Sequence, residues 1–516
     1  MRIILCHTGL AIDIIGIRLL SALLKQAGFN VELLFIPNME YELKRRGFHN
    51  RSFVTKYSEM ALEQITDFCR DADLIGLSLI SRDLDAAIDV TNALKQNLKT
   101  SVIWGGFHPT IFPEESLEFA DMVCIGEGER PLLELVELMD AGKDYSNVSG
   151  IWIKKNMKRN PVGQLIQNLD AMPFSDYDFS TQYLLTAERI EPLTSDLFLK
   201  YMKATFPALR PSNYKRKEPI PGSVAYHIIG KRGCPMNCTF CGSPQLKKIY
   251  AGQKYVRRRS VDNIISELKS IKARFDFFSD VNFPDDCFMM MPVQYVKEFC
   301  EKYKEEINMP FYCLTNPSSI TEDRLEYFVD AGLIHLDVGI QSGSKRITEL
   351  YNRVNANRGV ENAIALINRF EDRLFPYYDF IIDNPLETEK DQRATLELIS
   401  KMKRPFKIRV YSFVPYPGTV LYDILKEKEL LKGDNTEFFR KDFAQRGDEK
   451  SYLNLLIDLS KYNLPCGVTR FLRSDLMIWI CTKTIIKGAS KLVYKLISVI
   501  HYFREKSRYK QGKLLE

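Results

Sequence analysis

The sequence predicts an α/β protein with two parallel sheets in series and a helical C-terminal region. Short apolar runs of strand length alternate with longer helical segments over residues 1–140, and the same alternation returns over residues 223–430. Between them, residues 141–222 are irregular, and residues 431–516 read as helical. Strands that alternate with helices form parallel sheets covered by helices. A chain of 516 residues also exceeds the size of one core, so separate domains are expected.

The first alternation, residues 1–140, predicts a doubly wound, Rossmann-like parallel sheet. We expect strands over residues 3–5, 31–35, 74–78, 101–104 and 121–125, separated by helices over 17–26, 60–70 and 84–98. Ligands of such sheets bind at the carboxyl ends of the strands. Glycine there lets the backbone approach a large ligand closely, although tight turns also need glycine. The loops at these ends supply the candidate ligand residues, which are Ser78, Ser81, Gly105, Gly106, His108, Gly126, Glu127 and Gly128.

Residues 141–222 predict an irregular linker with one small hairpin, formed by residues 150–153 and 164–166. Residues 207–221 contain four prolines and several basic residues, which is typical of a surface link.

The second alternation predicts an open, TIM-like (β/α)6 partial barrel over residues 223–430. Six strands with helices between them over roughly 200 residues fit an open parallel barrel better than a flat sheet. The expected strands are 225–229, 277–283, 311–315, 335–340, 377–382 and 408–413. The expected helices are 260–274, 293–305, 321–331, 360–370 and 390–402.

Charge is distributed unevenly along the chain. Residues 471–516 carry seven Lys and three Arg against three acidic residues, a net charge of +7, so the first 470 residues sum to about −1. A nucleic-acid partner is therefore not expected. Four lysines recur at four-residue spacing beside apolar positions, which are Lys483, Lys487, Lys491 and Lys495. This pattern fits either an amphipathic helix on a membrane surface or a helix packed on the barrel.

The 11 cysteines and the lack of a secretory signal favour reduced thiols and a cytoplasmic protein, with peripheral membrane contact left open. No apolar run is long enough for a transmembrane helix.

Three closely spaced cysteines, Cys234, Cys238 and Cys241, follow the first expected barrel strand. One loop with this spacing can place three thiolates around a 4Fe–4S cluster and leave the fourth iron open. A structural zinc site needs a fourth Cys or His nearby, and none follows. A structural iron–sulfur or zinc loop is the alternative. Phe240, before the last cysteine, is positioned to shield the cluster and to touch an adenine.

With these cysteines, residues 225–430 resemble the radical S-adenosylmethionine (SAM) superfamily. The resemblance implies a flavodoxin- or ferredoxin-type reductant and a 5′-deoxyadenosyl radical formed from SAM. It also places SAM contacts at Phe240, Asp285, Gln341, Ser342 and Tyr411. The sequence departs from the family at Gln341, where glutamate is common, and at residues 384–386, which lack the usual glycine.

Residues 1–140 resemble the cobalamin-binding domain of one branch of this superfamily, that of the class B methyltransferases. The resemblance is carried by residues 102–110, 113–115 and 121–129 and assigns the candidate loop residues above to cobalamin. The histidine motif that ligates cobalt elsewhere is missing, and His7 reads as a loop residue. We therefore expect cobalamin bound without a histidine ligand, or else an empty scaffold of the same fold.

Together these resemblances imply methylation of an unactivated carbon of a small-molecule or lipid-like substrate. No catalytic residue is assigned beyond the cluster ligands. One alternative is rearrangement, cyclisation, oxidation or carbon–carbon coupling on the same scaffold. A second is methylthiolation of transfer RNA, with Cys6, Cys69 and Cys124 holding another cluster. A third is a non-catalytic cobalamin or redox sensor.

Overall fold

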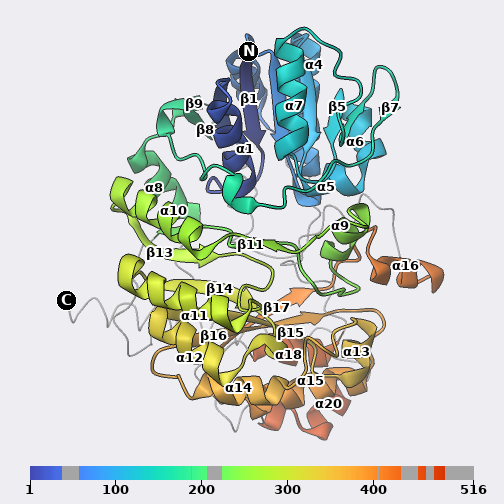
Figure 1. Cartoon of the computed structure of the whole chain (residues 1–516). Helices are drawn as coiled ribbons and strands as arrows, with labels where there is room; N and C mark the ends of the chain where they lie inside the picture. Colours follow the sequence, from blue (N-terminus) through green and yellow to red (C-terminus); the bar gives the residue numbers. More distant parts are fainter. Residues whose placement is uncertain are drawn as a thin grey trace.

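The computed structural model describes residues 1–37, 57–187, 189–205, 224–403, 406–431, 451–460 and 470–482. It contains two large sheets with parallel centres, one above the other in Figure 1, with α9 and β11 between them. The predicted basic helix around Lys483 lies outside the described residues. None of the helices within these ranges is long and apolar enough to cross a membrane.

The first sheet has nine strands in the order β7-β6-β5-β4-β3-β1-β2-β8-β9. Its parallel centre comprises β1 (Arg2–His7), β2 (Asn30–Phe35), β3 (Leu74–Ser78), β4 (Ser101–Gly105) and β5 (Met122–Cys124). Its helices are α1 (Ile15–Gln26), α3 (Glu59–Phe68), α4 (Leu84–Asn97), α5 (Phe107–Ile111), α6 (Pro113–Phe119) and α7 (Glu129–Asp140). The strand order reverses between β1 and β3, which is where doubly wound sheets bind ligands. This confirms the predicted fold class.

The segment predicted to be a linker instead extends the first sheet at both edges. At one edge, β6 (Ile151–Ile153) and β7 (Lys158–Arg159) follow β5 in antiparallel order. At the other edge, β8 (Gln182–Thr186) and β9 (Arg189–Pro192) follow β2, and α8 (Ser195–Thr205) comes next. The hairpin therefore pairs residues 151–153 with 158–159, not with 164–166. Edge strands of this kind cover the unpaired backbone of a parallel sheet.

A buried arginine ties this segment to α1. Arg18 is fully buried, and its guanidinium donates hydrogen bonds to Gln182 Oε1 at 2.9 Å and to the Asp176 carbonyl. Its guanidinium carbon also lies 4.1 Å from the centre of the Tyr177 ring, a cation–π contact. These partners lie more than 150 residues from Arg18, which is why local sequence pattern did not reveal that the segment packs here.

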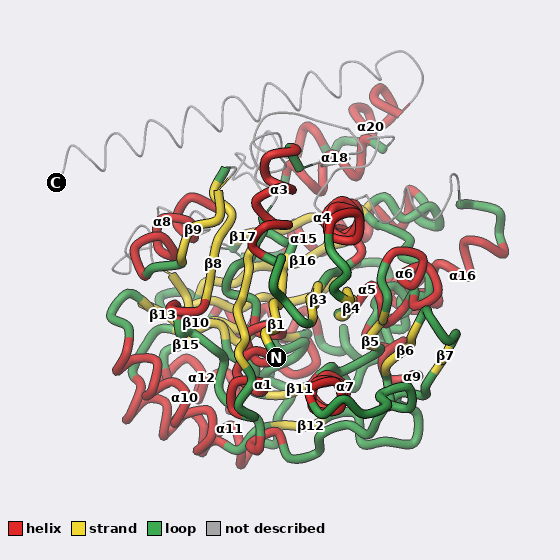
Figure 2. Tube along the Cα trace, turned by 90° about the horizontal axis from the view of Figure 1, so that it is seen from above, coloured by secondary structure: helices red, strands yellow, loops and turns green. Residues whose placement is uncertain are grey.

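The second sheet confirms the predicted partial barrel, with six parallel strands in chain order. The strands are β10 (Val224–His227), β13 (Phe278–Phe283), β14 (Phe311–Thr315), β15 (Leu333–Gln341), β16 (Phe375–Ile382) and β17 (Lys407–Ser412). The helices are α10 (Val261–Arg274), α11 (Val293–Lys302), α12 (Glu322–Ala331), α13 (Lys345–Leu350), α14 (Val360–Asn368) and α15 (Glu389–Lys401). The helices cover one face of this sheet, and the other face is concave (Figures 1 and 2).

Smaller elements complete the structure. Between the two sheets, β11 (Lys231–Arg232) pairs with β12 (Arg257–Arg258), and α9 (Ser243–Ile249) follows the cysteine loop. The described part of the C-terminal region is helical as predicted, with α18 (Tyr452–Leu459) packed on α15 and β17. α20 (Asp475–Thr482) contacts α18, whereas α16 (Val420–Glu427) packs against Ile347 of α13 and Phe240 of the cysteine loop.

The two domains fit together sterically at Gly126, which lies two residues after β5 and has a positive φ of 81°. The Tyr250 hydroxyl, at the end of α9, accepts a hydrogen bond from the backbone N–H of Glu127 at 2.6 Å. A Cβ atom at position 126 would lie 2.0 Å from that hydroxyl oxygen. Glycine is therefore required here for the contact between the domains.

We predict that Gly126→Ala lowers the free energy of unfolding by about 3 kcal/mol, because the left-handed backbone and the Tyr250 hydroxyl both oppose a Cβ. Gly28→Ala is the matched control, since Gly28 also has a positive φ, +93°, but a Cβ added there would have no atom within 4 Å. Thermal and urea unfolding of both variants measure the difference. Adding Tyr250→Phe should restore part of the loss, and equal effects at the two glycines would contradict the steric argument.

Candidate active site

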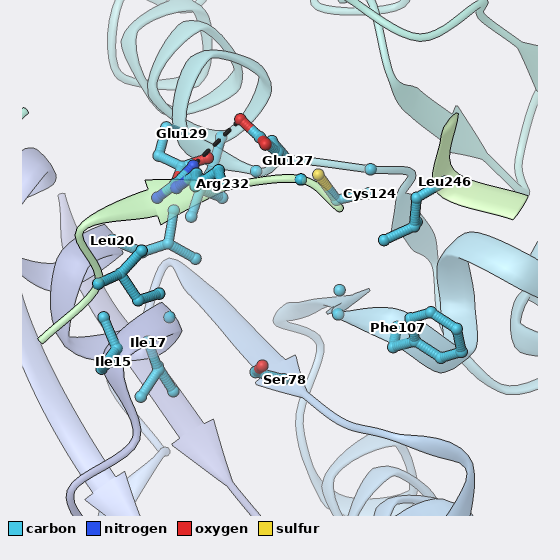
Figure 3. A pocket seen from close by; sticks show the side chains of 18 of the residues that line it. Ile15, Ile17, Leu20, Ser78, Phe107, Cys124, Glu127, Glu129, Arg232 and Leu246 are labelled. Atoms are coloured by element: carbon cyan, nitrogen blue, oxygen red, sulfur yellow. Dashed lines mark hydrogen bonds and ion pairs between the residues drawn. The ribbon is translucent and has the colours of Figure 1, made fainter. Parts of the chain in front are cut away.

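A cavity of 630 Å³ lies between the two sheets (Figure 3). From the first domain it is lined by the carboxyl ends of β3, β4 and β5 and by the start of α1. From the barrel it is lined by β11, the cysteine loop and the end of β13. Both predicted ligand-binding regions therefore face the same space.

Most of the candidate loop residues of the first domain reach this cavity. Those that line it are Ser78, Gly105, Gly106, Gly126, Glu127 and Gly128. Ser81 and His108 are buried behind it, where His108 Nδ1 lies 3.0 Å from Ser81 Oγ. Burial lowers the pKa of His108 to about 4, so the ring is neutral. These two side chains support the loop and do not line the cavity.

Gly106 is required by the protein's own backbone. Its φ is +102°, and a Cβ there would lie 2.6 Å from the Leu79 carbonyl oxygen. The backbone therefore requires glycine at position 106 without any role for a ligand. In the same way, the Tyr250 hydroxyl accounts for the glycine at position 126.

The cysteine loop sits directly against the first domain. Cys241, Gly242 and Ser243 line the cavity, and a Cβ on Gly242 would lie 2.1 Å from Cζ of Phe107 in α5. The loop begins at Gly233, whose φ of +85° and closeness to the Tyr255 carbonyl exclude a side chain. The backbone turn that presents the cysteines therefore depends on glycine and on a packed aromatic ring.

The chemistry of the loop fits a cluster held by three thiolates. Cys241 Sγ accepts a hydrogen bond from the Ser243 N–H, and Cys238 Sγ accepts one from Arg353, both at 3.4 Å. Burial is the main cause that raises the pKa of Cys234 to about 12, with smaller contributions from Asp286, Cys287 and Cys241. Burial also raises the pKa of Cys241, with a contribution from Cys238. Bound iron is the positive charge that would stabilise these crowded thiolates.

Among the described residues, no three His, Cys, Asp or Glu side chains are arranged as ligands of a single metal ion.

Three of the predicted SAM contacts take part in local structure. Phe240 packs edge-to-face on Tyr351, with ring centroids 5.0 Å apart. The Asp285 carboxylate accepts the backbone N–H groups of Gly230 and Lys231, which holds the loop before Cys234. Ser342 Oγ accepts the Ser344 N–H at 3.1 Å and is buried.

Gln341 and Tyr411 lie at the carboxyl ends of β15 and β17. Gln341 has a positive φ of 71°, a strained backbone for a residue with a side chain. Of the five predicted SAM contacts, Asp285 lines the cavity. The individual SAM contacts remain predictions.

Two basic residues of the site were missed by sequence reasoning. Arg353 is buried beside Cys238, and its guanidinium also donates to the Gly339 carbonyl at 2.5 Å. Cys238 lies 115 residues away in sequence, so no local motif connects the two. Lys231 lines the cavity, and its buried amine has no hydrogen-bond partner among the residues that the structure describes. Its position three residues before Cys234 is the sequence feature that could have identified Lys231 as a residue of the site.

An ion network joins the domains at the edge of the cavity (Figure 3). Arg232 contacts Glu127 at 3.0 Å and Glu129 at 2.5 Å. Arg257, which is almost fully buried, pairs with Glu127 through both terminal nitrogens. Burial opposes ionisation of Glu127, but the two arginines outweigh it and lower the pKa of this carboxyl. Glu127 is thus held as an anion between two cations of the other domain.

We predict that Glu127→Gln destabilises the docking of the two domains by about 3 kcal/mol, because it leaves buried guanidinium charge unpaired. The folded pKa of Glu127 is lowered, so its stabilisation is present above the unfolded pKa and is lost as pH falls through the folded one. Thermal unfolding and limited proteolysis of the interdomain segments measure the effect.

Glu114→Gln is the matched control, since Glu114 pairs with Arg159 on the surface. It should change the unfolding midpoint little. A Glu127→Gln variant that unfolds and digests like this control would contradict the proposed role of the network.

Comparison with known proteins agrees with this architecture. Residues 228–399 match the radical SAM superfamily model, and residues 1–136 match the B12-binding domain model. The chain is therefore a radical SAM enzyme with an N-terminal B12-binding domain. The cofactors of these domains are a 4Fe–4S cluster, SAM and cobalamin.

Curated relatives differ in the reactions for which they are named. An uncharacterized methyltransferase of Pyrococcus horikoshii is 24% identical over 367 residues, which cover 70% of this chain and 71% of the relative. The anaerobic magnesium-protoporphyrin IX monomethyl ester cyclase of Rubrivivax gelatinosus is 24% identical over 433 residues, which cover 81% of this chain and 66% of that one.

The fold resembles that of the radical SAM methyltransferase TsrM from Kitasatospora setae, solved with cobalamin and a 4Fe–4S cluster. The TM-score is 0.58 at 16% identity, and the match covers 83% of this chain and 75% of TsrM. At this identity the likeness is one of fold.

Proposed function

We propose that the protein transfers a methyl group to an unactivated carbon of a small molecule. The observation that carries this proposal is the shared cavity. The strand ends of the B12-binding domain and the cysteine loop with Cys241 line the same 630 Å³ space. A methyl donor on one side and a radical generator on the other would then reach one substrate carbon without diffusing apart. The match to a relative named as a methyltransferase supports the same reaction class.

The chain's own residues would bind, orient and shield the cofactors. Cys234, Cys238 and Cys241 would hold the cluster, and Arg353 would stabilise the Cys238 thiolate through its N–H···S hydrogen bond. The cavity wall of the first domain includes Leu5, Ile15, Ile17, Leu20, Ile103 and Leu132, which would exclude water.

When bound, the cluster and SAM supply hydrogen abstraction and cobalamin supplies methyl transfer.

No histidine of the described part of the chain lines the cavity. His7 is buried, with its Nδ1 3.1 Å from the Ser78 carbonyl oxygen, and burial lowers its pKa. Its placement supports cobalamin binding without a histidine ligand from this loop.

We predict that Cys238→Ala, purified and reconstituted without oxygen, loses the 4Fe–4S absorption band and all SAM cleavage. The missing thiolate leaves a second iron without a protein ligand. Iron analysis, the absorption spectrum and 5′-deoxyadenosine release measure this. Cys300→Ala is the control, because Cys300 is buried in α11 within the apolar core. SAM cleavage retained by Cys238→Ala would refute the ligand assignment.

Cyclisation or another non-methylating reaction is the second candidate, because the cyclase relative matches 81% of this chain. SAM labelled in its methyl group separates the two. We predict that the reconstituted enzyme with bound cobalamin transfers label to the product and forms both S-adenosylhomocysteine and 5′-deoxyadenosine. A modified product without label, formed with 5′-deoxyadenosine alone, would favour the second candidate.

Methylthiolation gains no support from the positions of the other cysteines. Cys6 and Cys69 lie in the apolar core on one face of the first sheet. Cys124 belongs to the core on the opposite face. The three thiols are therefore not arranged to hold a second cluster. A non-catalytic sensor would release no 5′-deoxyadenosine, so the Cys238 experiment tests that alternative too.

A further inference from the structure

Most side chains on the concave face of the barrel sheet carry polar groups. On each strand the alternate residues that face the helices, such as Val281, Leu336 and Phe380, belong to the apolar core. The intervening residues face the concave side. Those with hydrogen-bonding or charged groups include His227, Asp280, Asn282, Tyr312, His335, Asp337, Tyr377, Asp379, Lys407, Arg409 and Tyr411. A surface that binds an acyl chain would be lined mainly by apolar side chains.

Three adjacent strands carry a connected ion network on this face. Arg409 of β17 donates two hydrogen bonds to Asp379 of β16, at 2.7 and 2.9 Å. Its guanidinium also lies 2.9 Å from Asp337 of β15, and His335 Nε2 lies 2.9 Å from the other Asp337 oxygen. The side chains of Arg409 and His335 are 28% and 18% exposed. Water-sized molecules therefore reach this network.

The network has spare capacity to accept hydrogen bonds. A carboxylate offers about four acceptor sites, and the contacts above occupy only some of those on Asp337 and Asp379. Burial and the neighbouring Asp337 raise the pKa of Asp379 to about 6, although Arg409 opposes the shift. Burial therefore disfavours the charged form of Asp379, and a hydrogen-bond donor bound beside the carboxylate would stabilise that form.

A second polar group lies on the other side of the same face, on β10 and β13. His227 Nε2 lies 3.4 Å from Asp13 Oδ2 and 3.5 Å from Asn282 Nδ2. Asp13 comes from the loop after β1, so the B12-binding domain contributes to this group. Asn282 is 9% exposed, and its Oδ1 is buried with no hydrogen-bond partner in the described ranges. A buried acceptor left unpaired costs about 1–3 kcal/mol, which a bound donor would recover.

We infer that this concave face binds a polar substrate that donates hydrogen bonds, a small molecule bearing hydroxyl or amino groups, and that it does not bind a lipid. The inference rests on the proposed function and specifies its substrate class. Asn282 and the carboxylates of Asp337 and Asp379 are the acceptors that recognise the donors. The two groups lie on opposite sides of one sheet face, so a substrate that contacts both is oriented as well as bound.

The test uses the reconstituted holoenzyme, a chemical reductant and SAM labelled in its methyl group. An extract of the source cells is partitioned between chloroform and aqueous methanol, and each phase is supplied separately as the substrate source. We expect at least about tenfold more label in products of the aqueous phase than in products of the organic phase. A compound that lacks one hydrogen bond to a charged group of the site would bind about tenfold more weakly. Label mainly in products of the organic phase would overturn the inference.

This design separates the two claims. The aqueous phase could stimulate 5′-deoxyadenosine release without any transfer of label. That result would overturn the proposed methyl transfer and support the proposed substrate class. If neither phase receives label nor stimulates release, both claims are overturned.

A substitution tests the site itself. Asn282→Leu removes the unpaired acceptor. We expect labelling to fall about tenfold when the aqueous phase is limiting and to recover as more of that phase is added, because the substitution raises KM. Asn282→Asp keeps the acceptor and should retain labelling. Iron and cobalamin analysis verifies that each variant contains its cofactors. Asn97→Leu, at an exposed position, is the control for an asparagine-to-leucine substitution outside the site. Unchanged labelling by Asn282→Leu at limiting substrate would exclude this residue from recognition and overturn the assignment of the site.

Discussion

The position of Glu127 between Arg232 and Arg257 is the constraint on which the active site depends. The glutamate belongs to the turn between β5 and α7, and the arginines belong to the β11–β12 ribbon of the other domain. Strand β11 leads directly through Gly233 into Cys234. Any shift of the first domain would therefore move the ribbon that carries the cluster ligands. The electrostatic contact fixes the two cofactor-binding regions at one distance across the cavity.

Steric fit acts together with this ion network. At Gly126 and at Gly242 a side chain of one domain occupies the space that a Cβ of the other would fill. The partners are Tyr250 and Phe107, both aromatic and therefore rigid. An ion network alone tolerates small changes in angle, whereas a ring packed on a glycine does not. The combination gives a defined separation, which a reaction between two bound cofactors requires.

The sequence predicted the features that depend on local pattern. The six barrel strands and five of their helices were found within a few residues, because alternate apolar residues pack on the helices. The cysteine loop was found because three ligands share one short segment. The features that depend on distant partners were missed. Strand β8, with which β9 pairs, is held by Arg18 across more than 150 residues, and Arg353 reaches Cys238 across 115. Ser81 and His108 were assigned to the ligand because they lie 27 residues apart in two predicted loops, and the sequence does not reveal that their side chains contact each other.

The cavity wall of the first domain and the concave face of the barrel are two different environments, and their difference fits what each would do. The cavity wall of the first domain is largely aliphatic, since a reactive intermediate must be kept from water. The concave face of the barrel is polar, since an aliphatic surface cannot fix the orientation of a small molecule about its own axis. Directional hydrogen bonds from a substrate to Asn282 Oδ1 and to the Asp379 carboxylate would do so, while the apolar wall would keep water from the reacting carbon. Asp13, which extends from the first domain to His227, links the two environments, so docking of that domain also completes the polar surface.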